Sequence, residues 1–438
     1  MRTADFLGQD GGVKDSGDHS EIMNRRDLLC AGAGLAFATL PGVAGAVSRT
    51  EFMQFSPPPV PAPGPGGLTI ESIEIFWLHD DTKMGAAFPR LFVRVYTREG
   101  VVGEAYTFFW HSWDHVVELI RDGIAPLLIG MDAMQVERCW ERAWLVLDRE
   151  FARGVGNSVM PQFARALAAI DAALWDAVGK ALDAPCYKMW GAYSNALPVV
   201  SFDQRYRHPG PDYDPVKFGN HMAKLVDMGF AGVKLKPGRP PYTPKQDAKW
   251  VRIVREAVGP DFLIQADANL RWTVDEAIDF GRRVQDLDLR WLEEPCRTRR
   301  DMARVRAATG LPICAGQSEV TIEGARYLMT DNAIDVCNYD PGYGGGPTAW
   351  RKVYGLAQAF GVEMSVHQQP QVAAHLMAAT PDGVKHGIEV YMADMDPFFY
   401  QMIENQSPIE NGVYRLPEGP GFGFVYDEKI VAKYRHEV

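Results

Sequence analysis

The chain has 438 residues, of which 47% are hydrophobic and 23% charged; these fractions are usual for a water-soluble globular protein, and the length suits two domains. Its formal net charge of -11 at pH 7 argues against nucleic acid or an anionic membrane surface as a partner, because like charges repel. The net charge does not exclude a small anionic substrate, because the binding of a small molecule depends on the charges close to its site.

Residues 1–46 have the features of an export signal of the twin-arginine type. Arg25 and Arg26 stand directly before the apolar run Leu28–Leu40, and Ala44-Gly45-Ala46 supplies small residues for cleavage. The run is short for a membrane span, which needs about 20 apolar residues. We therefore expect a periplasmic or otherwise exported protein with no membrane segment after cleavage; a frayed helix and an uncleaved anchor are the alternatives.

Two segments follow the signal. Residues 47–67 are rich in proline and glycine and are expected to form a stiff, solvated linker. Residues 68–195 combine strand-like and helical patterns, which predict an N-terminal α+β capping domain. The expected strands are Leu68–Leu78, Arg90–Arg98 and Val101–Tyr106. The expected helices are Trp113–Leu128 and Gln162–Leu182.

From residue 196 to residue 408, short apolar strands alternate with amphipathic helices. Eight strands are expected, near Val199, Val233, Leu263, Leu292, Ile313, Val336, Ser365 and Ile388. This alternation predicts an α/β fold, a parallel (β/α)8-type barrel. An open doubly wound sheet is the competing architecture, but no glycine fingerprint follows its first strand. Residues 409–438 have no ninth unit to join and are expected to pack on the N-terminal domain.

Two lysines stand at the end of the second barrel strand, and barrel enzymes build their sites at such strand ends. Lys234 and Lys236 are two residues apart, so both side chains point to the same side of the strand. Two ammonium groups so close lower the pKa of one of them toward the range of a general base. For this spacing alone, a solvated lysine pair is the commoner interpretation.

Acidic residues and one histidine follow at the ends of later strands. Asp267 and Glu293 each end an apolar strand, and carboxylate oxygens that meet at one barrel mouth suit Mg²⁺. Asp340 and His367 end consecutive strands, where a carboxylate can fix the imidazole tautomer and leave its other nitrogen free as a base. Taken singly, the acids could be helix caps or solvated loop residues, and a lone histidine is usually a core residue.

As a set, these residues resemble the enolase superfamily and, within it, the mandelate racemase-like subgroup, the mandelate racemase/muconate lactonizing enzyme family. The resemblance covers the chain from about Leu68 to the C-terminus. It is carried by Lys234-Leu235-Lys236, Asp267-Ala268-Asn269, Glu293-Glu294-Pro295, Asp340, His367 in FGVEMSVHQ, Glu389 in HGIEVY and the helix ALAAIDAALWDAVGKALDAP. It implies a Mg²⁺-dependent enzyme that removes the proton α to a carboxylate through an enediolate.

The resemblance also implies roles for single residues. Lys236 and His367 would face opposite sides of the substrate carbon. Lys234 would neutralise the enediolate together with the metal, and Glu389 would donate a hydrogen bond to the developing oxyanion. Asp267 and Glu293 would be metal ligands.

The third metal ligand departs from the family pattern, in which a glutamate follows the glycine directly. Here Gly316 is followed by Gln317, and the next acid is Glu319. We expect Glu319 to be the ligand, because a carboxylate binds Mg²⁺ better and both residues share a face if the strand continues; Gln317 is the alternative. Glu294 alternates to the other side of its strand and is expected to be structural.

Dehydration of an acid sugar to a 2-keto-3-deoxy acid is the expected reaction of a small carboxylate substrate. The polar cluster Asp203, Gln204 and Arg205 favours it, because these side chains could bind hydroxyl groups. Racemisation or epimerisation of a 2-hydroxy acid is the alternative. This alternative is favoured if an aromatic stretch of the N-terminal domain lines the pocket. That stretch is Tyr106, Phe108, Phe109, Trp110 and Trp113.

A third class is an exported binding protein that kept the fold and lost turnover, and Gln317 is the feature that favours it. A homo-oligomer is expected in each case.

Overall fold

The computed structural model describes residues 64, 66–79, 89–108, 113–147, 156–202, 214–367, 370–391, 400–406 and 409–438. All of them belong to one compact unit, Val60–Val438. The export signal and nearly all of the linker lie outside the described residues, so both stay predictions. The same holds for Asp203, Gln204, Arg205, Phe109 and Trp110, and for the side chains of Phe108 and Trp113. Within the described ranges, no helix combines the length and the apolarity that crossing a membrane requires.

The N-terminal domain is an antiparallel sheet covered by helices. The strands β1 (Ile70–Leu78), β2 (Arg90–Thr97) and β3 (Val102–Phe108) pair in sequence order. The long helix α7 (Gly156–Ala181) packs on β2 and β3. A Cβ at Gly103 would lie 2.1 Å from the Ala173 carbonyl oxygen, so only glycine lets the helix approach β3 this closely.

The helix expected over Trp113–Leu128 is interrupted. It consists of α3 (Trp113–Glu118), a π-helical turn η1 (Leu119–Ile124) and α4 (Ala125–Leu128). Pro126 stands in the first turn of α4 and has no N–H to continue the hydrogen-bond ladder of the preceding turn. Two further helices of this domain are α5 (Val136–Ala143) and α8 (Cys186–Met189).

Eight parallel strands form the second domain. They are β4 (Ala196–Ser201), β5 (Gly232–Leu235), β6 (Leu263–Asp267), β7 (Trp291–Glu293), β8 (Ile313–Ala315), β9 (Val336–Cys337), β10 (Glu363–Met364) and β11 (Ile388–Val390). Their order is β11-β4-β5-β6-β7-β8-β9-β10, which is the circular order of a (β/α)8 barrel. Among the described residues no ladder joins β10 to β11, so the hydrogen-bonded cylinder is open at that seam.

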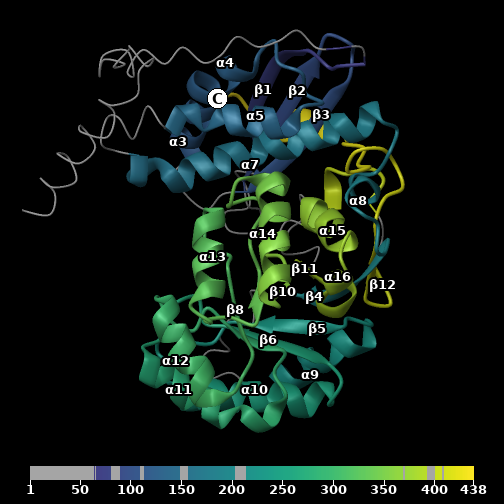
Figure 1. Ribbon diagram of the computed structural model, residues 1–438. Helices are drawn as coiled ribbons and strands as arrows, with labels where there is room; N and C mark the ends of the chain where they lie inside the picture. Colours follow the sequence, from purple (N-terminus) through teal and green to yellow (C-terminus); the bar gives the residue numbers. More distant parts are fainter. Residues whose placement is uncertain are drawn as a thin grey trace, which may run out of the picture. The chain divides into compact units, whose positions relative to one another are not determined.

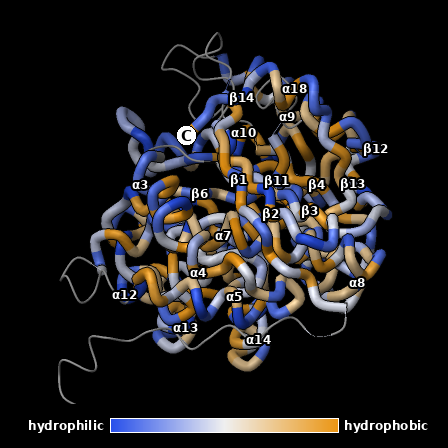
Figure 2. The backbone as a smooth tube through the Cα atoms, turned by 90° about the horizontal axis from the view of Figure 1, so that it is seen from above, coloured by the Kyte–Doolittle hydropathy of each residue, from blue (hydrophilic) through white to orange (hydrophobic). Residues whose placement is uncertain are grey.

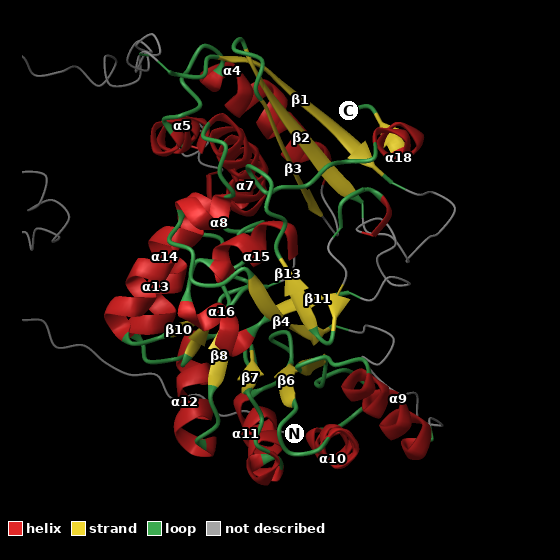
Figure 3. Cartoon of the chain, turned by 90° about the vertical axis from the view of Figure 1, so that its right-hand side faces the viewer, coloured by secondary structure: helices red, strands yellow, loops and turns green. Residues whose placement is uncertain are grey.

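Helices surround these strands on the outside (Figures 1 and 3). They are α9 (Pro215–Asp227), α10 (Pro244–Val258), α11 (Val274–Arg283), η3 (Gln285–Leu287), α12 (Arg299–Thr309), α13 (Ile322–Thr330), α14 (Gly346–Phe360), α15 (Pro370–Ala378) and α16 (Pro381–His386). Thr243 and Thr273 open α10 and α11 with reciprocal capping boxes, which satisfy backbone N–H groups that each first turn leaves unpaired.

The C-terminal segment divides between the two domains. Its first strands, β12 (Ile409–Glu410) and β13 (Val413–Arg415), form a hairpin that pairs antiparallel with the start of β4. Further on, α18 (Glu428–Tyr434) leads into β14 (Arg435–His436), which pairs with β1. From about Gly421 onward the segment packs on the N-terminal domain as expected, since Phe422 N–H donates to Asp176 and the Tyr426 ring contacts Phe92, whereas the hairpin joins the barrel.

One continuous apolar core runs through the barrel and the N-terminal domain. Figure 2 shows hydrophobic residues along β4 and β13 and hydrophilic residues at many outer turns. The helix α7 contacts both the antiparallel sheet and α14, so it joins the two domains beside the barrel mouth (Figure 3).

Candidate active site

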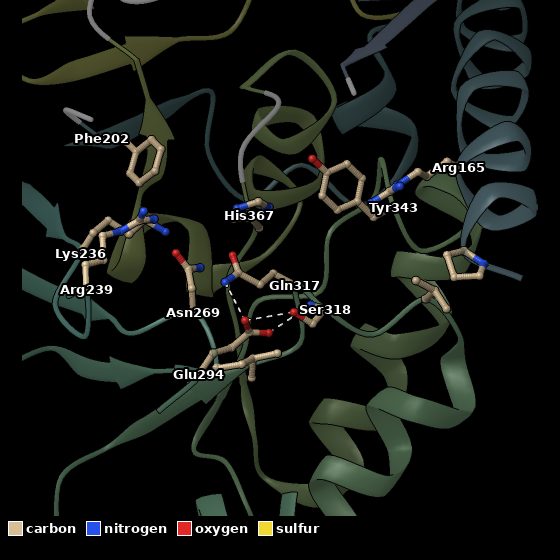
Figure 4. Close-up of a pocket in the computed structure, with 13 residues that line it drawn as sticks. Arg165, Phe202, Lys236, Arg239, Asn269, Glu294, Gln317, Ser318, Tyr343 and His367 are labelled. Atoms are coloured by element: carbon tan, nitrogen blue, oxygen red, sulfur yellow. Dashed lines mark hydrogen bonds between the residues drawn. The ribbon is translucent and has the colours of Figure 1, made fainter. Parts of the chain in front are cut away.

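A cavity of about 510 Å³ opens at the C-terminal ends of the barrel strands. Residues that follow seven of the eight strands line it, and α7 contributes two more from the N-terminal domain (Figure 4). The lining residues used below are Arg165, Phe202, Lys236, Arg239, Asn269, Glu294, Gln317, Ser318, Tyr343 and His367. Of the charged residues predicted from the strand ends, Lys236 and His367 therefore line one space.

The two lysines of β5 are buried beside carboxylates. The Lys234 Nζ lies 2.6 Å from Glu293 Oε1, 2.6 Å from Glu389 Oε1 and 3.7 Å from Asp267 Oδ2. Burial alone would lower the pKa of Lys234, but these carboxylates raise it well above its usual value. Lys236 pairs with Asp267. Burial and the charge of Lys234 outweigh that partner and lower the pKa of Lys236.

Asp267 and Glu293 stand side by side at the ends of β6 and β7, where they are partners in register and fully buried. Asp267 accepts hydrogen bonds from the backbone N–H and the side-chain amide of Asn269, at 2.8 and 3.0 Å. Glu293 accepts from Trp291 Nε1 at 3.0 Å and from Asn338 Nδ2 at 2.9 Å. These bonds fix the orientation of both carboxylates.

Their electrostatic environments differ. Against the effect of burial, the charges of Lys236 and Lys234 hold the pKa of Asp267 below its usual range. Burial and the neighbouring Asp267 carboxylate raise the pKa of Glu293 well above its usual value. A pair of buried acids with opposite shifts is typical of a functional site.

The structure gives no support to the preference for Glu319 as third metal ligand, which stays a prediction. Strand β8 ends at Ala315, and Gly316 has a φ of +143°, so the alternation assumed for residues 317 and 319 does not continue. The Glu319 carboxylate lies against Gly324 in the first turn of α13, where a Cβ on Gly324 would be 2.0 Å from Glu319 Oε2. Glu319 is near enough to Glu294 for their charges to interact, but no contact with Asp267 or Glu293 is seen among the described residues.

Gln317 takes the place beside the acids. Its Nε2 donates to Glu294 Oε2 at 3.0 Å and lies 3.4 Å from Asp267 Oδ2. Its Oε1 is buried and has no hydrogen-bond partner among the described residues. A buried acceptor without a donor is costly unless something else binds it, and a cation satisfies such an oxygen.

Glu294 was expected to be structural, yet its carboxylate lines the cavity. Strand β7 ends at Glu293, and Glu294 adopts a φ of +40°, which turns its side chain back to the mouth. The carboxylate accepts from Ser318 N at 3.1 Å, from Ser318 Oγ at 3.0 Å and from Gln317. Burial and the Asp267 charge raise its pKa. In the sequence, only the adjacent acids Glu293-Glu294 indicated that a second carboxylate could reach the mouth.

His367 and Asp340 form the predicted pair. His367 Nδ1 lies 2.7 Å from Asp340 Oδ2, and Asp340 Oδ1 accepts from the backbone N–H of Gly342 at 2.7 Å. A proton on Nδ1 in this bond leaves Nε2 as the nitrogen that can accept a proton, in a ring that lines the cavity. Figure 4 shows His367 and Lys236 apart from each other, with Gln317 and Asn269 lying lower between them.

A divalent cation fits the oxygen atoms of this mouth. Asp267, Glu293 and the amide oxygen of Gln317 are hard donors of the kind Mg²⁺ prefers. In the structure, Lys234 and Lys236 form ion pairs with these carboxylates. Among the described residues, no group of three or more His, Cys, Asp or Glu side chains surrounds a metal position. The oxygen donors available here for a metal are thus two carboxylates and one amide, the alternative that the sequence left open with Gln317.

Comparison with known proteins identifies the family. The mandelate racemase/muconate lactonizing enzyme N-terminal domain matches residues 83–191, and the enolase C-terminal domain-like family matches residues 217–430. A crystal structure of a mandelate racemase/muconate lactonizing enzyme from a marine actinobacterium, in complex with magnesium, superposes with a TM-score of 0.75 at 37% identity, covering 85% of this chain and 100% of that chain. The chain therefore belongs to this family of the enolase superfamily, which confirms the resemblance and the barrel fold.

Curated relatives narrow the class of enzyme. A D-galactarolactone cycloisomerase of Agrobacterium fabrum is 30% identical over 325 residues, covering 70% of this chain and 82% of the relative. An arabinonate dehydratase of Saccharolobus solfataricus is 27% identical over 349 residues, covering 77% and 88%. The chain is an enzyme of this superfamily, and the non-catalytic binding protein considered from Gln317 has no support.

Proposed function

We propose that the protein is a Mg²⁺-dependent acid-sugar dehydratase that forms a 2-keto-3-deoxy acid. The observation that carries the proposal is one cavity bounded by two different proton-transfer groups, Lys236 and the His367–Asp340 pair, above the buried carboxylates Asp267 and Glu293. The named dehydratases among the relatives support the same reaction class.

Asp267, Glu293 and the amide oxygen of Gln317 would hold the metal. When bound, Mg²⁺ supplies positive charge at the substrate carboxylate, which makes the α-proton more acidic and stabilises the enediolate. Lys234 adds a second positive charge below this position, and its contacts with Glu293 and Glu389 keep it there. Pre-placed charge of this kind lowers a barrier by several kcal/mol.

Lys236 is suited to remove the α-proton. Its lowered pKa gives a larger fraction of free amine near neutral pH than an exposed lysine has. His367 then protonates the β-hydroxyl as its C–O bond breaks, and water leaves. The enol that remains takes up a proton at C3 and loses its O–H proton, which gives the 2-keto-3-deoxy acid. Lys236 then releases the proton it removed and His367 regains the one it donated by exchange with solvent, so the protons balance.

Racemisation is the second candidate, because two bases at one carbon can exchange a proton on either face. Of the aromatic stretch, Tyr106 is the residue whose side chain is described, and it gives racemisation no support. Tyr106 is buried in the N-terminal domain, with its ring 6.2 Å from that of Phe92, and does not line the cavity. The polar lining formed by Arg165, Asn269 and Ser318 suits the hydroxyl groups of an acid sugar.

The test is turnover of a panel of acid sugars and 2-hydroxy acids, read as 2-keto acid formation, with and without Mg²⁺. We expect activity that EDTA removes and Mg²⁺ restores. His367→Asn and Lys236→Ala should each lower kcat by about 10² to 10⁴ fold. The exposed His115 and Lys249 provide matched controls, His115→Asn and Lys249→Ala, which should behave like the wild type.

Recovered substrate from reactions in D₂O separates the two candidates. A racemase returns the opposite stereoisomer carrying deuterium at Cα, whereas a dehydratase accumulates keto acid. Full turnover in EDTA, or wild-type rates in both His367→Asn and Lys236→Ala, would contradict the proposed chemistry.

A further inference from the structure

Glu294 is fixed in place by its own backbone. Its N–H donates to the Cys314 carbonyl at 2.9 Å, and its carbonyl accepts from the backbone N–H of Leu270 at 2.7 Å. Between these two bonds the residue has a φ of +40°, a left-handed conformation that costs free energy in residues other than glycine. The side chain that this conformation presents lines the cavity. Strain that is kept beside a site points to a role for the carboxylate.

The Glu294 carboxylate is buried and fixed by hydrogen bonds to the loop after β8. Its Oε1 accepts from Ser318 N at 3.1 Å, and its Oε2 accepts from Ser318 Oγ at 3.0 Å and from Gln317 Nε2 at 3.0 Å. Figure 4 shows Glu294 lying below both residues. An ionised carboxylate can only accept hydrogen bonds, so it selects the N–H end of a neighbouring amide.

Gln317 is therefore held at both of its ends. Its backbone N–H donates to Asn338 Oδ1 at 3.2 Å, and Asn338 Nδ2 donates to Glu293 Oε1 at 2.9 Å. Its side-chain amide is held by Glu294. The Gln317 Oε1 is buried and has no hydrogen-bond partner among the described residues. Rotation of the amide would exchange this oxygen with Nε2, and the contact with Glu294 opposes that rotation.

We propose that Glu294 is a positioning residue for Mg²⁺, which holds the Gln317 amide so that its oxygen and not its N–H meets the cation. This rests on the proposed function, which puts the metal at Asp267, Glu293 and Gln317. A turned amide would place an N–H against the cation and the amide oxygen against the Glu294 carboxylate, and both contacts are repulsive. A carboxylate ligand has two equivalent oxygens and needs no such partner, whereas an amide ligand does.

The experiment is isothermal titration of Mg²⁺ into the metal-free, substrate-free full-length enzyme. Glu294→Asp keeps the charge but is one methylene shorter, so it no longer reaches the Gln317 amide. We expect Mg²⁺ affinity to fall by about tenfold or more, because a hydrogen bond to a charged group is lost and the amide can turn. In a Gln317→Glu background, the same change should alter the affinity by less than about threefold, since a carboxylate at 317 has no wrong end. Glu256→Asp, on the exposed face of α10, is the control and should leave the affinity unchanged.

The outcomes separate this inference from the proposed function. Wild-type affinity in Glu294→Asp, or an equal loss in both backgrounds, refutes the positioning role while the metal-dependent dehydratase remains. A wild type that binds no Mg²⁺ and keeps full turnover in EDTA means that the proposed function itself fails. If urea unfolding shows that Glu294→Asp does not fold, Glu294→Gln decides by the same comparison. That variant keeps the length of the side chain and loses its preference for N–H, and its lost charge is common to both backgrounds.

Discussion

At the scale of single residues, the proposed metal site has an amide where a carboxylate was expected. Gln317 contributes no negative charge, so under the proposed function Mg²⁺ would be held by two carboxylates, Asp267 and Glu293, and one neutral oxygen. Glu294 lies next to Gln317 and accepts a hydrogen bond from its amide N–H, while the buried amide oxygen has no hydrogen-bond partner among the described residues. The neutral ligand weakens attraction for the cation and leaves more of its charge for the substrate carboxylate.

Gln317→Glu should therefore bind Mg²⁺ about tenfold or more tightly, because affinity for hard cations rises with the number of charged ligands. Isothermal titration of the substrate-free enzyme measures this directly. Without metal, the new carboxylate would stand close to Glu294 and Asp267, so the variant should melt at a lower temperature and recover when Mg²⁺ is added. Glu319→Gln is the control, and a loss of affinity in that variant would return the ligand role to Glu319.

At the scale of elements, helix α15 connects the site to the rest of the fold. It begins shortly after His367 and carries His375, which is fully buried. His375 Nδ1 accepts from the backbone N–H of Tyr187 at 3.2 Å, and its Nε2 lies 3.1 Å from the Phe422 carbonyl, to which Nε2–H donates. The imidazole thus joins α15 to α8 and to the C-terminal segment.

Burial lowers the pKa of His375 to about 3, which makes stability depend on pH. In the unfolded chain His375 binds a proton near pH 6.5, whereas in the folded chain it does not until about pH 3. The contribution of this lowered pKa to the stability of the fold is therefore present above pH 6.5 and is lost as the pH falls. His375→Gln cannot titrate and keeps an amide donor for Phe422. The free energy of unfolding in urea should show the wild type losing about 2 kcal/mol more than this variant between pH 7 and pH 4.5. Parallel losses in both proteins would show that His375 titrates normally in the folded state.

At the scale of the whole molecule, the two domains meet where α7 approaches the start of α14. Asp171 on α7 accepts hydrogen bonds from the backbone N–H and the hydroxyl of Thr348, both at 2.8 Å. Trp140 Nε1 donates to the Gly345 carbonyl at 2.8 Å. Since α7 also carries Arg165, this contact sets the position of a residue that lines the cavity at the barrel mouth.

Gly346 is the residue that permits this contact. It has a φ of +92°, and a Cβ there would lie 2.3 Å from Asp171 Oδ2. Gly346→Ala should lower the free energy of unfolding by about 2 kcal/mol or more, because both the backbone and the contact are strained. Gly355→Ala in the same helix meets no atom within 4 Å and should be neutral or stabilising by up to about 1 kcal/mol. Equal urea midpoints for the two variants would mean that the domain contact has no such constraint.

Much of the barrel and part of the site follow from sequence patterns alone. Apolar strands alternate with amphipathic helices because each element must bury one face. The spacing of hydrophobic residues that reveals this can be read within each short segment of the chain. Lys234, Lys236, Asp267, Glu293, Asp340 and His367 end their strands, and parallel strand ends meet at one mouth whatever the details of packing. The sequence therefore predicted which of these side chains lie together.

The tertiary structure decided what lies just beyond the strand ends and what reaches the mouth from elsewhere. Glu319 was favoured on the assumption of continued alternation, but side-chain direction follows backbone dihedrals, and β8 stops before Gly316. Glu294 turned inward for the same reason. Arg165 and Tyr343 are far apart in the chain and meet only because α7 packs against α14. Strand periodicity is encoded locally, whereas the dihedrals of a turn and the docking of a distant helix depend on contacts that no local pattern contains.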